Sequence, residues 1–297
     1  MIILDGGMGR HLKTIGAPFG QPEWSALSLI EDPSYVTLAH NDFINAGAEY
    51  ITTNSYGIVP FHIGEERFNK DAENLLILAG KLAFDAKAAS QSKVKVAAGI
   101  PPVFGSYKPD AFNSKAAVPI LELFRDCLLE FSDIIIGETL SSIDELKTVQ
   151  GVFADCKKPI WLSLTLIDDD NDSDLVTPKL RSGELVQDAL KAIDFNIVDA
   201  VLFNCSQPEV MASAITMAVN NCKKETLVGV YANAFPSINS SQKSANNQIR
   251  TIRPDLDPLS YKEFAKKWLQ LGATIIGGCC GIGPDHIAEL RSLKKEI

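Results

Sequence analysis

Thr274-Ile275-Ile276-Gly277-Gly278-Cys279-Cys280-Gly281 is the stretch from which the fold can be worked out. It opens on a short apolar, β-branched run without polar alternation, which is typical of a strand buried on both faces of a parallel sheet. Just before it, Leu271-Gly272 is a plausible helix end. The stretch therefore predicts a helix, then a buried parallel strand, then a strand end that carries glycines and two thiols.

The same kind of apolar run recurs along the whole chain. Each run is short and nearly continuous, as expected for strands covered on both faces. We predict eight strands, at Ile2–Asp5, Tyr50–Asn54, Val94–Ile100, Asp133–Thr139, Pro159–Thr165, Ala200–Cys205, Leu227–Asn233 and Thr274–Cys280.

A longer amphipathic segment follows each run. Asp32-Pro33-Ser34 begins one such helix and the glycine of Asn45-Ala46-Gly47-Ala48 ends it. Ser141-Ser142-Ile143-Asp144-Glu145 offers a capping start for another. The remaining predicted helices span Asn69–Ala89, Ala116–Phe131, Ser141–Ala154, Gly183–Phe195, Pro208–Asn220, Pro258–Leu271 and Pro284–Lys295.

Eight strand-then-helix units in 297 residues predict an α/β fold of the (β/α)8 TIM barrel type. A doubly wound open sheet shows the same alternation and is the alternative. Without a linker or low-complexity segment, we expect a single domain over residues 1–297. Two polar insertions, 168–182 after strand five and 237–257 after strand seven, fall on the face where a barrel builds its active site. Each is either a lid or donor-binding loop, or an ordinary surface excursion.

Composition narrows the class of function. Hydrophobic residues make up 46% and charged residues 22% of the chain, with a formal net charge of −9. An acidic balance argues against nonspecific binding to nucleic acid or anionic membranes. No stretch approaches the ~20 apolar residues of a membrane span, and Met1-Ile2-Ile3-Leu4-Asp5 lacks the basic start of a signal peptide. We expect a cytoplasmic protein whose six cysteines serve packing, catalysis or metal binding.

Polar or metal-capable residues close strand after strand. In a barrel the catalytic groups sit at these carboxyl ends. The ends are Asp5-Gly6-Gly7, Thr53-Asn54-Ser55-Tyr56, Gly137-Glu138-Thr139, Asn204-Cys205-Ser206, Tyr231-Ala232-Asn233 and Gly277-Gly278-Cys279-Cys280-Gly281.

Three cysteines fall at two of these ends. Strands six and eight lie near one another in a barrel, so Cys205, Cys279 and Cys280 can converge on one point. Three thiolates with an open fourth position form a catalytic zinc site. Because successive strand residues point to opposite faces, Cys279 and Cys280 can both bind only if the backbone leaves the strand, which the flanking glycines allow. The alternative is that Cys205 is a small core residue.

Other candidate metal ligands are set aside. The run Asp168 to Asp174 lacks the glycine and glutamate that a calcium loop requires, so we interpret it as a solvated acidic loop. The four histidines form no close metal-binding pair, and we expect structural roles for them. Cys127, Cys156 and Cys222 are assigned to packing.

These motifs together resemble the homocysteine S-methyltransferase family along the whole chain. The Gly-Gly-Cys-Cys-Gly end, with an Asn-Cys far upstream, is the specific part of the resemblance. The matching segments, in order and spacing, are Leu4-Asp5-Gly6-Gly7-Met8-Gly9, Trp24-Ser25-Ala26, Ala46-Gly47-Ala48, Thr52-Thr53-Asn54-Ser55-Tyr56, Gly137-Glu138-Thr139, Asn204-Cys205 and Ile276-Gly277-Gly278-Cys279-Cys280-Gly281.

The resemblance implies a zinc enzyme on a (β/α)8 barrel. It implies that Cys205, Cys279 and Cys280 hold Zn²⁺ and that the acceptor thiol takes the fourth position. The two acids of the substrate pocket would bind the amino group of homocysteine. The backbone of the two glycines in the pocket would bind its carboxylate. The Thr-Asn pair would form a further part of the pocket. The substrate-binding residues implied are Asp5, Gly6, Gly7, Thr53, Asn54 and Glu138.

The implied site has a chemical logic of its own. A free thiol with a pKa of ~8.5 is mostly protonated at neutral pH, and zinc coordination deprotonates it. Its natural partner is a methyl group on a sulfonium or ammonium centre, which leaves as a neutral molecule. The π faces of Trp24 and Tyr56 would attract such a cation, with packing on the barrel rim as the alternative. Trp24, Tyr56 and Asn233 are the candidate donor-pocket residues.

The donor is the open question. The short chain and Trp24-Ser25-Ala26 resemble the S-methylmethionine-using branch more than the betaine-using one, whereas Tyr231-Ala232-Asn233 departs from the Tyr-Pro-Asn of many relatives. Alternatives are methylation of another small thiol or selenol such as selenocysteine, an acceptor module that takes methyl from methylcobalamin in trans, and a binding barrel without catalysis. The expected partners are small molecules only, and the oligomeric state is left open.

Overall fold

The computed structural model describes residues 1–168, 177–236 and 251–296. Residues 169–176 of the first expected insertion and residues 237–250 of the second lie outside the described residues, so the lid or donor-loop interpretation of those stretches stays a prediction.

Eight parallel strands form one sheet in the order β1-β8-β7-β6-β5-β4-β3-β2. The two end strands meet, because Leu4 pairs with Tyr50 in a parallel bridge and the Asp5 N–H donates to the Tyr50 carbonyl at 2.9 Å. The sheet therefore closes as the predicted (β/α)8 barrel and not as an open doubly wound sheet. The strands are β1 Ile2–Ile3, β2 Tyr50–Thr52, β3 Lys95–Ile100, β4 Ile134–Leu140, β5 Ile160–Leu164, β6 Val198–Asn204, β7 Leu227–Tyr231 and β8 Ile275–Ile276.

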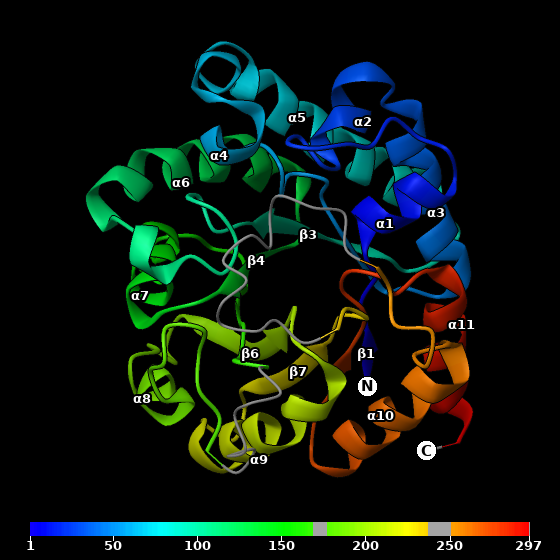
Figure 1. The fold of residues 1–297 in the computed structure, drawn as a ribbon, viewed down its shortest axis with the longest axis vertical. Coiled ribbons are helices and arrows are strands. Elements are labelled where there is room, and N and C mark those ends of the chain that lie inside the picture. The colour runs from blue at the N-terminus through cyan, green and yellow to red at the C-terminus, as the bar shows by residue number, and fades with distance from the viewer. Residues whose placement is uncertain (169–176, 237–250, 297) are drawn as a thin grey trace.

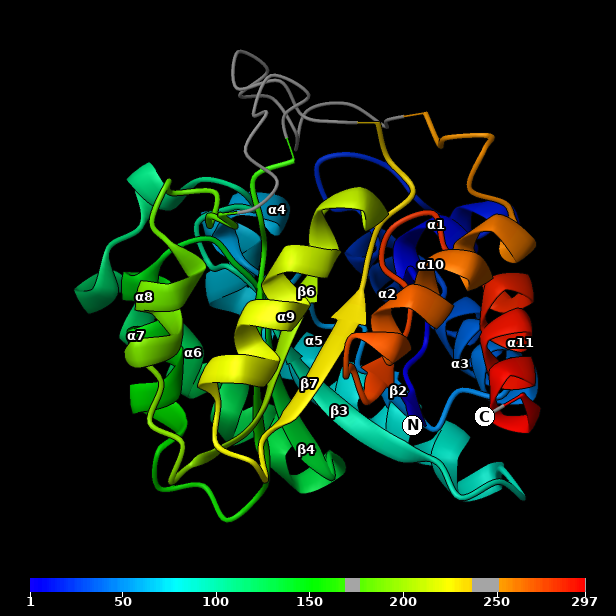
Figure 2. The ribbon, with the colours of Figure 1, turned by 90° about the horizontal axis from the view of Figure 1, so that it is seen from below.

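Helices surround the strands on the outside, as Figure 1 shows, and Figure 2 shows α9 lying beside β7. Short helices that the sequence pattern did not indicate are α1, α2 and α4, and α8 is shorter than its predicted span of 183–195. The helices are α1 Met8–Thr14, α2 Ala26–Glu31, α3 Ser34–Ala46, α4 Pro60–Ile63, α5 Glu65–Ala89, α6 Ser114–Leu128, α7 Ile143–Phe153, α8 Val186–Lys191, α9 Met211–Asn221, α10 Pro258–Gln270 and α11 Pro284–Ser292.

Side chains of each strand alternate between two cores. Within β4, Ile134 and Ile136 pack inside the barrel, whereas Ile135 packs against the helices. Tyr50 and Trp161 pack against each other inside the barrel, with ring centroids 4.9 Å apart and ring planes tilted by 40°, and fill its amino-terminal half. This packing leaves the carboxyl ends of the strands as the place for a cavity.

The helix ends follow their sequence signals. Ser142 accepts the Glu145 N–H at the start of α7, Asp257 accepts the Ser260 N–H at the start of α10, and Gly47 ends α3 with φ 111°. Among the helices of the described ranges, none is both long and apolar enough to cross a membrane.

Candidate metal and substrate site

A cavity of about 170 Å³ opens at the carboxyl ends of the strands. It is the position at which barrel enzymes place their active sites. All of the predicted site residues line it except Asn233. The lining is Leu4, Asp5, Gly6, Gly7, Met8, Gly9, Trp24, Ser25, Thr52, Thr53, Asn54, Tyr56, His62, Ser106, Tyr107, Ile136, Glu138, Thr139, Asn204, Cys205, Tyr231, Phe235, Gly278, Cys279 and Cys280.

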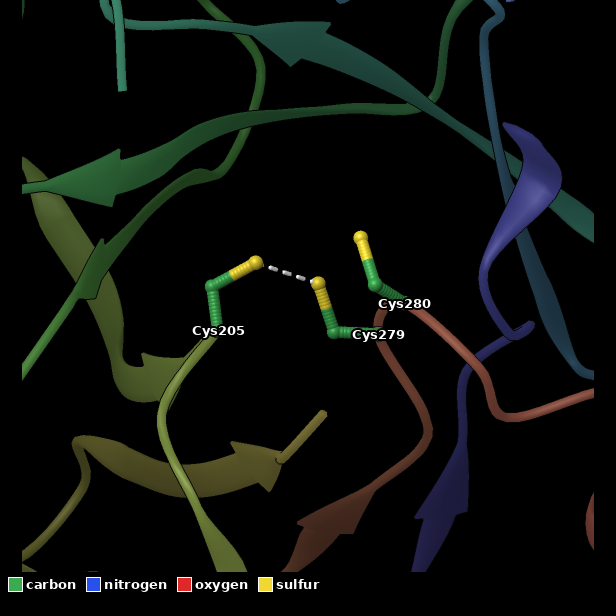
Figure 3. A group of neighbouring side chains, drawn as sticks. All are labelled: Cys205, Cys279 and Cys280. Carbon is green, nitrogen blue, oxygen red and sulfur yellow. Dashed lines mark hydrogen bonds between the residues drawn. The ribbon is translucent and has the colours of Figure 1, made fainter. Parts of the chain in front are cut away.

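The three predicted cysteines meet in this cavity. Their sulfur atoms all lie within 4.8 Å of one another, and those of Cys205 and Cys279 are 2.7 Å apart. Figure 3 shows that Cys205 comes from one segment and the adjacent pair from another, with the sulfurs pointing into a common space. Zinc–sulfur bonds of about 2.3 Å place the sulfurs of a tetrahedral site about 3.8 Å apart, so the cluster can surround one ion once Cys205 and Cys279 separate by about 1 Å. Among the residues that the structure describes, these three cysteines are the group of His, Cys, Asp or Glu side chains placed closely enough to hold one metal ion.

Glycines let the backbone leave β8 so that both Cys279 and Cys280 face the cavity, though only one does so by a left-handed conformation. Gly281 has φ +88°, a left-handed conformation that glycine adopts without a steric cost, as predicted from the sequence. Gly277 and Gly278 serve close approach instead. A Cβ at Gly278 would lie 2.1 Å from Ile282 Cγ2, and one at Gly277 would lie 2.6 Å from Leu4 Cβ. Glycine is required at these two positions because there is no space for a side chain.

The thiols share ionisation. Hydrogen bonds from Cys205 and Cys279 hold the pKa of Cys280 well below its usual range. The hydrogen bond to Cys279 lowers the pKa of Cys205, but the one to Cys280 and burial outweigh it and raise that pKa to about 12. The pKa of Cys279 is raised by its contacts with both partners and by burial. Within the cluster, ionisation is therefore favoured at Cys280 over Cys205 and Cys279.

Two buried acids share the cavity with the thiols. Burial raises the pKa of Asp5 to about 7, against the hydrogen bonds that its carboxylate accepts from the Thr52 N–H at 2.6 Å and the Thr52 hydroxyl at 3.2 Å. Burial and the nearby Asp5 raise the pKa of Glu138 to about 8, and the Tyr231 hydroxyl donates to Glu138 Oε1 at 3.3 Å. Two acids held so close in a buried space form a site for a cation.

Left-handed backbone is concentrated at the cavity. Within the described chain, the non-glycine residues with positive φ are Trp24 at 53°, Tyr107 at 61°, Thr139 at 59° and Cys205 at 53°. All four line the cavity. Such a conformation costs on the order of 1–2 kcal/mol for a residue with a Cβ. Strained backbone of this kind clusters at functional sites, where the surrounding contacts hold it.

The side chain of Asn204 holds one of these left-handed residues, Thr139, in place. Its Oδ1 accepts the Thr139 N–H at 3.0 Å, and its Nδ2 donates to the Thr139 hydroxyl at 2.9 Å. The Ser163 hydroxyl also donates to Asn204 Oδ1, at 2.8 Å. Asn204 thereby holds the left-handed Thr139, which directly follows Glu138 in β4, and connects the ends of β6 and β4.

The predicted Thr53 and Asn54 line the cavity while their polar groups support its wall. The Thr53 hydroxyl accepts the Gly99 N–H at 3.0 Å, and Asn54 Nδ2 donates to the Ser25 carbonyl at 3.0 Å. Of the two glycines expected to receive a carboxylate, Gly7 uses its N–H in a hydrogen bond to the Ile282 carbonyl at 2.9 Å. The expected carboxylate site at the backbone of Gly6 stays a prediction.

The three candidate donor residues lie in different surroundings. Trp24 and Tyr56 both line the cavity, and the Tyr56 hydroxyl lies 2.6 Å from the Ser106 hydroxyl. Trp24 Nε1 is buried and has no hydrogen-bond partner among the described residues. Asn233 is buried behind the wall, where its Oδ1 accepts the Phe235 N–H at 3.1 Å.

Sequence reasoning missed a buried ion pair beside the cluster. Arg181 donates to Asp168 at 2.6 Å, and the side chains are only 8% and 1% exposed. The interpretation of Asp168 as part of a solvated loop is therefore wrong, because its carboxylate pairs with Arg181 and also accepts the Gln207 N–H at 3.1 Å. The remainder of that acidic run lies outside the described residues. The spacing of thirteen residues between the partners gave no pattern that would have indicated the pair.

The residues set aside from the site have structural surroundings. Cys127 is buried in the core between helices and strands. His11 pairs with Asp42 at 2.7 Å, and His286 accepts the Gly283 N–H at 3.2 Å at the start of α11. His62 contacts the Pro22 carbonyl at 3.0 Å but also lines the cavity. His40 is fully buried, and burial lowers its pKa to about 4, so it is neutral.

A closed parallel barrel with three thiols and two buried acids at its catalytic face defines a barrel enzyme with a metal-capable thiol cluster. A family profile described as "Homocysteine S-methyltransferase" matches residues 2–293. The chain belongs to the homocysteine S-methyltransferase family.

Relatives match over nearly their whole length. The chain is 28% identical to Homocysteine S-methyltransferase 1 of Brassica oleracea var. italica, over 99% of this chain and 93% of the relative. It is 26% identical to Homocysteine S-methyltransferase YbgG of Bacillus subtilis, over 99% and 96%. The crystal structure of the metallated form of the homocysteine methyltransferase MmuM from Escherichia coli shares the fold, with a TM-score of 0.78, 23% identity and coverage of 99% and 96%.

Proposed function

We propose that this enzyme transfers a methyl group from a small sulfonium or ammonium donor, S-methylmethionine being favoured, to the thiol of homocysteine. Methionine is then the product. The observation that carries the proposal is that Cys205, Cys279 and Cys280 meet in the same cavity as Asp5 and Glu138. A thiol cluster beside an acid pair suits an acceptor that has a sulfur at one end and an ammonium at the other.

The three cysteines fit Zn²⁺ as the cofactor. They offer three soft sulfur ligands within 4.8 Å and no fourth protein ligand among the described residues, which is the donor set of an open, catalytic zinc site. When bound, the ion lowers the pKa of the acceptor thiol, so that its sulfur is a nucleophile at neutral pH. All six cysteines are free in the structure, and we propose a compartment that keeps them reduced, such as the cytoplasm.

Asp5 and Glu138 supply the binding site for the acceptor's ammonium. Thr52 orients the carboxylate of Asp5 through its N–H and hydroxyl, and Tyr231 orients Glu138. Because each acid is buried, an ammonium group replaces solvation that the carboxylates have lost and favours their charged forms. The backbone at Gly6 is proposed to receive the carboxylate, and the wall formed by Thr53 and Asn54 to set the depth of the pocket.

The donor side of the cavity is suited to a cation. The described lining contains no lysine or arginine, while Trp24 and Tyr56 contribute aromatic rings. A sulfonium or quaternary ammonium methyl group is attracted to such rings, whereas the cations nearest the cavity, Arg10 over Phe235 and Arg181 over Tyr107, lie behind the lining. Holding this methyl group in line with the acceptor sulfur would supply much of the rate enhancement.

A donor panel tests the proposal. Purified, reduced protein is supplied with homocysteine and, in separate reactions, S-methylmethionine, S-adenosylmethionine, betaine, dimethylsulfoniopropionate or methylcobalamin, and methionine is measured. We expect S-methylmethionine to give the highest rate and the protein to contain about one zinc per chain. Activity only with methylcobalamin, or only with another acceptor such as selenocysteine, would contradict the proposed reaction. Zinc-free protein of undiminished activity would contradict the cofactor.

A further inference from the structure

The backbone carbonyl of Cys205 accepts hydrogen bonds from three side chains that the proposed reaction does not use, of which the Thr165 hydroxyl is the most distant, at 3.5 Å. The Tyr107 hydroxyl donates to this oxygen at 3.0 Å, and Arg181 Nη2 donates to it at 3.3 Å. The two donors also contact each other, since the Arg181 guanidinium lies over the Tyr107 ring, 4.4 Å from its centroid. One main-chain oxygen is thus held by a charged and a neutral donor at once.

Arg181 is fixed from behind. Its Nη1 donates to Asp168 Oδ1 at 2.6 Å, and Asp168 Oδ2 accepts the N–H of Gln207, two residues beyond Cys205. Both charged side chains are almost fully buried, at 8% and 1% exposure. A buried ion pair of this kind has a fixed geometry, because moving either partner would leave the other charge without compensation.

This fixed geometry bears on a strained residue. Cys205 has φ +53°, a left-handed conformation that few residues with a Cβ adopt. β6 ends at Asn204, and in a regular strand Cys205 would face away from its neighbour. The left-handed turn brings the Cys205 side chain to the cavity and its carbonyl to Tyr107 and Arg181. A return to strand geometry would break both of these hydrogen bonds.

We propose that Arg181 and Tyr107, with Asp168 behind them, are positioning residues that hold the Cys205 thiol in place for the metal. The inference rests on the proposed function, in which that thiol is a zinc ligand. Groups that orient metal ligands in this way typically change metal affinity by about 10–100-fold when they are removed. The Arg181 guanidinium should affect metal affinity more than the Tyr107 hydroxyl does, because its hydrogen bond to the Cys205 carbonyl is charge-assisted.

The test measures metal binding in the full chain. Zinc affinity is determined by competition with a chromophoric chelator for the unchanged chain, Arg181→Met and Tyr107→Phe, and each is also loaded with Co²⁺ for its thiolate charge-transfer spectrum. We expect Arg181→Met to weaken zinc binding about 10–100-fold and Tyr107→Phe roughly 3- to 10-fold. The Co²⁺ spectrum should lose intensity in the same order. Arg181→Lys should restore part of the affinity, since it keeps the charge without the fork.

Lys158→Met is the matched control. Lys158 donates to the carbonyls of Leu129 and Ser132 at the other end of the barrel, so this variant also removes a cation from main-chain oxygens. Its zinc affinity should equal that of the unchanged chain. Folded Arg181→Met and Tyr107→Phe proteins with unaltered affinity and spectrum would overturn the inference, and Tyr107→Phe alone decides if the arginine variant does not fold. An unchanged chain that binds no zinc would instead contradict the proposed function.

Discussion

Asn204 and Cys205 follow one another at the end of β6, yet both side chains line the cavity. The same is true of Glu138 and Thr139 in β4. Strand geometry sends neighbouring side chains to opposite faces, so each pair requires a break in the backbone, and the breaks fall at Cys205 and Thr139. At residue scale, the site is made by two left-handed turns that non-glycine residues adopt under constraint.

Cys280 is the thiol whose loss should affect metal binding and activity most directly. It has the lowest pKa of the cluster, because both neighbouring thiols hydrogen-bond to it. In Cys280→Ser a hydroxyl replaces the sulfur, and we expect metal content to fall to background and the methyl-transfer rate to drop by at least about 100-fold. Metal analysis and a methionine assay on the same sample check this expectation.

Cys127→Ser provides the comparison for that variant. Cys127 is a buried cysteine of α6 that packs in the core away from the cavity. Its serine variant should lose some stability but keep its metal and its rate per folded molecule. Equal effects of the two substitutions on metal content would show that the cluster is not the metal site.

Glu138 gives the acceptor site a pH dependence. Its pKa is raised to about 8 and that of Asp5 to about 7, so both acids are largely protonated below about pH 6 and ionised above about pH 9. Binding of an ammonium group requires the ionised forms, so the KM for homocysteine should fall as pH rises from about 6 to about 8, before the amino group of homocysteine itself loses its proton. In Glu138→Gln this dependence should flatten, and the KM at high pH should increase about 10- to 100-fold, the value of a charge-assisted hydrogen bond.

Glu145→Gln is the control that distinguishes a buried acid that binds homocysteine from a buried acid that does not. Glu145 is also buried with a pKa raised to about 7, but it accepts the Ser141 N–H near the start of α7 and does not line the cavity. Its raised pKa should make the protein less stable as pH rises from about 4 to about 7, without changing the KM for homocysteine. A donor KM that changes with Glu138→Gln as much as the acceptor KM would contradict the assignment of that acid to the acceptor.

At the scale of elements, the sequence was sufficient for the barrel because each strand is a short apolar run followed by an amphipathic helix. The strands observed lie within or beside their predicted runs, but β8 ends at Ile276 instead of Cys280. The predicted run included the glycines and cysteines, which leave the sheet to shape the cavity. The helices α1, α2 and α4 were missed because stretches of four to seven residues are too short to show a helical period.

The site was only partly predictable for a related reason. Strand-end position and residue type were enough to find the thiols and the acids. The contacts of Arg181 and Tyr107 with the Cys205 carbonyl join residues 24 and 98 positions apart in the chain. No local pattern encodes such contacts, and a left-handed φ at a cysteine or threonine has no sequence signature of the kind that glycine provides.

The segment after β8 gives a prediction at this scale. Because a Cβ at Gly278 would lie 2.1 Å from Ile282 Cγ2, Gly278→Ala should force the loop that carries Cys279 and Cys280 to shift. We expect a loss of about 1–3 kcal/mol in the free energy of unfolding and weaker metal binding. Urea denaturation and chelator competition measure the two effects.

Gly283→Ala is the control in the same loop. Nothing lies within 4 Å of a Cβ built at Gly283, and its φ of −100° suits any residue. Because Gly283 is the N-cap of α11, alanine there should cost up to about 1 kcal/mol in stability, but metal binding should not change. If the two alanine variants behave alike, close packing is not the reason for glycine at position 278.

At the scale of the whole molecule, the barrel is least tightly paired where it closes. β1 and β8 pair over only two residues each, and the contact of β1 with β2 depends on the bridge between Leu4 and Tyr50. β5 and β6, by contrast, pair over five positions. The three thiols lie at the ends of β6 and β8, on either side of β7, so an ion bound to them would connect the well-paired part of the barrel to its seam.

Metal removal should therefore lower the stability of the entire barrel. Zinc bound only to the folded chain stabilises it by about 2.7 kcal/mol at a free concentration 100 times the dissociation constant. Binding of the ion to the six cysteines of the unfolded chain reduces this gain. We expect chelator-treated protein to unfold at a lower urea concentration than zinc-loaded protein, while Cys280→Ser unfolds at the same concentration with and without zinc. Coincident unfolding curves for the two forms of the unchanged chain would show that no ion connects β6 to β8.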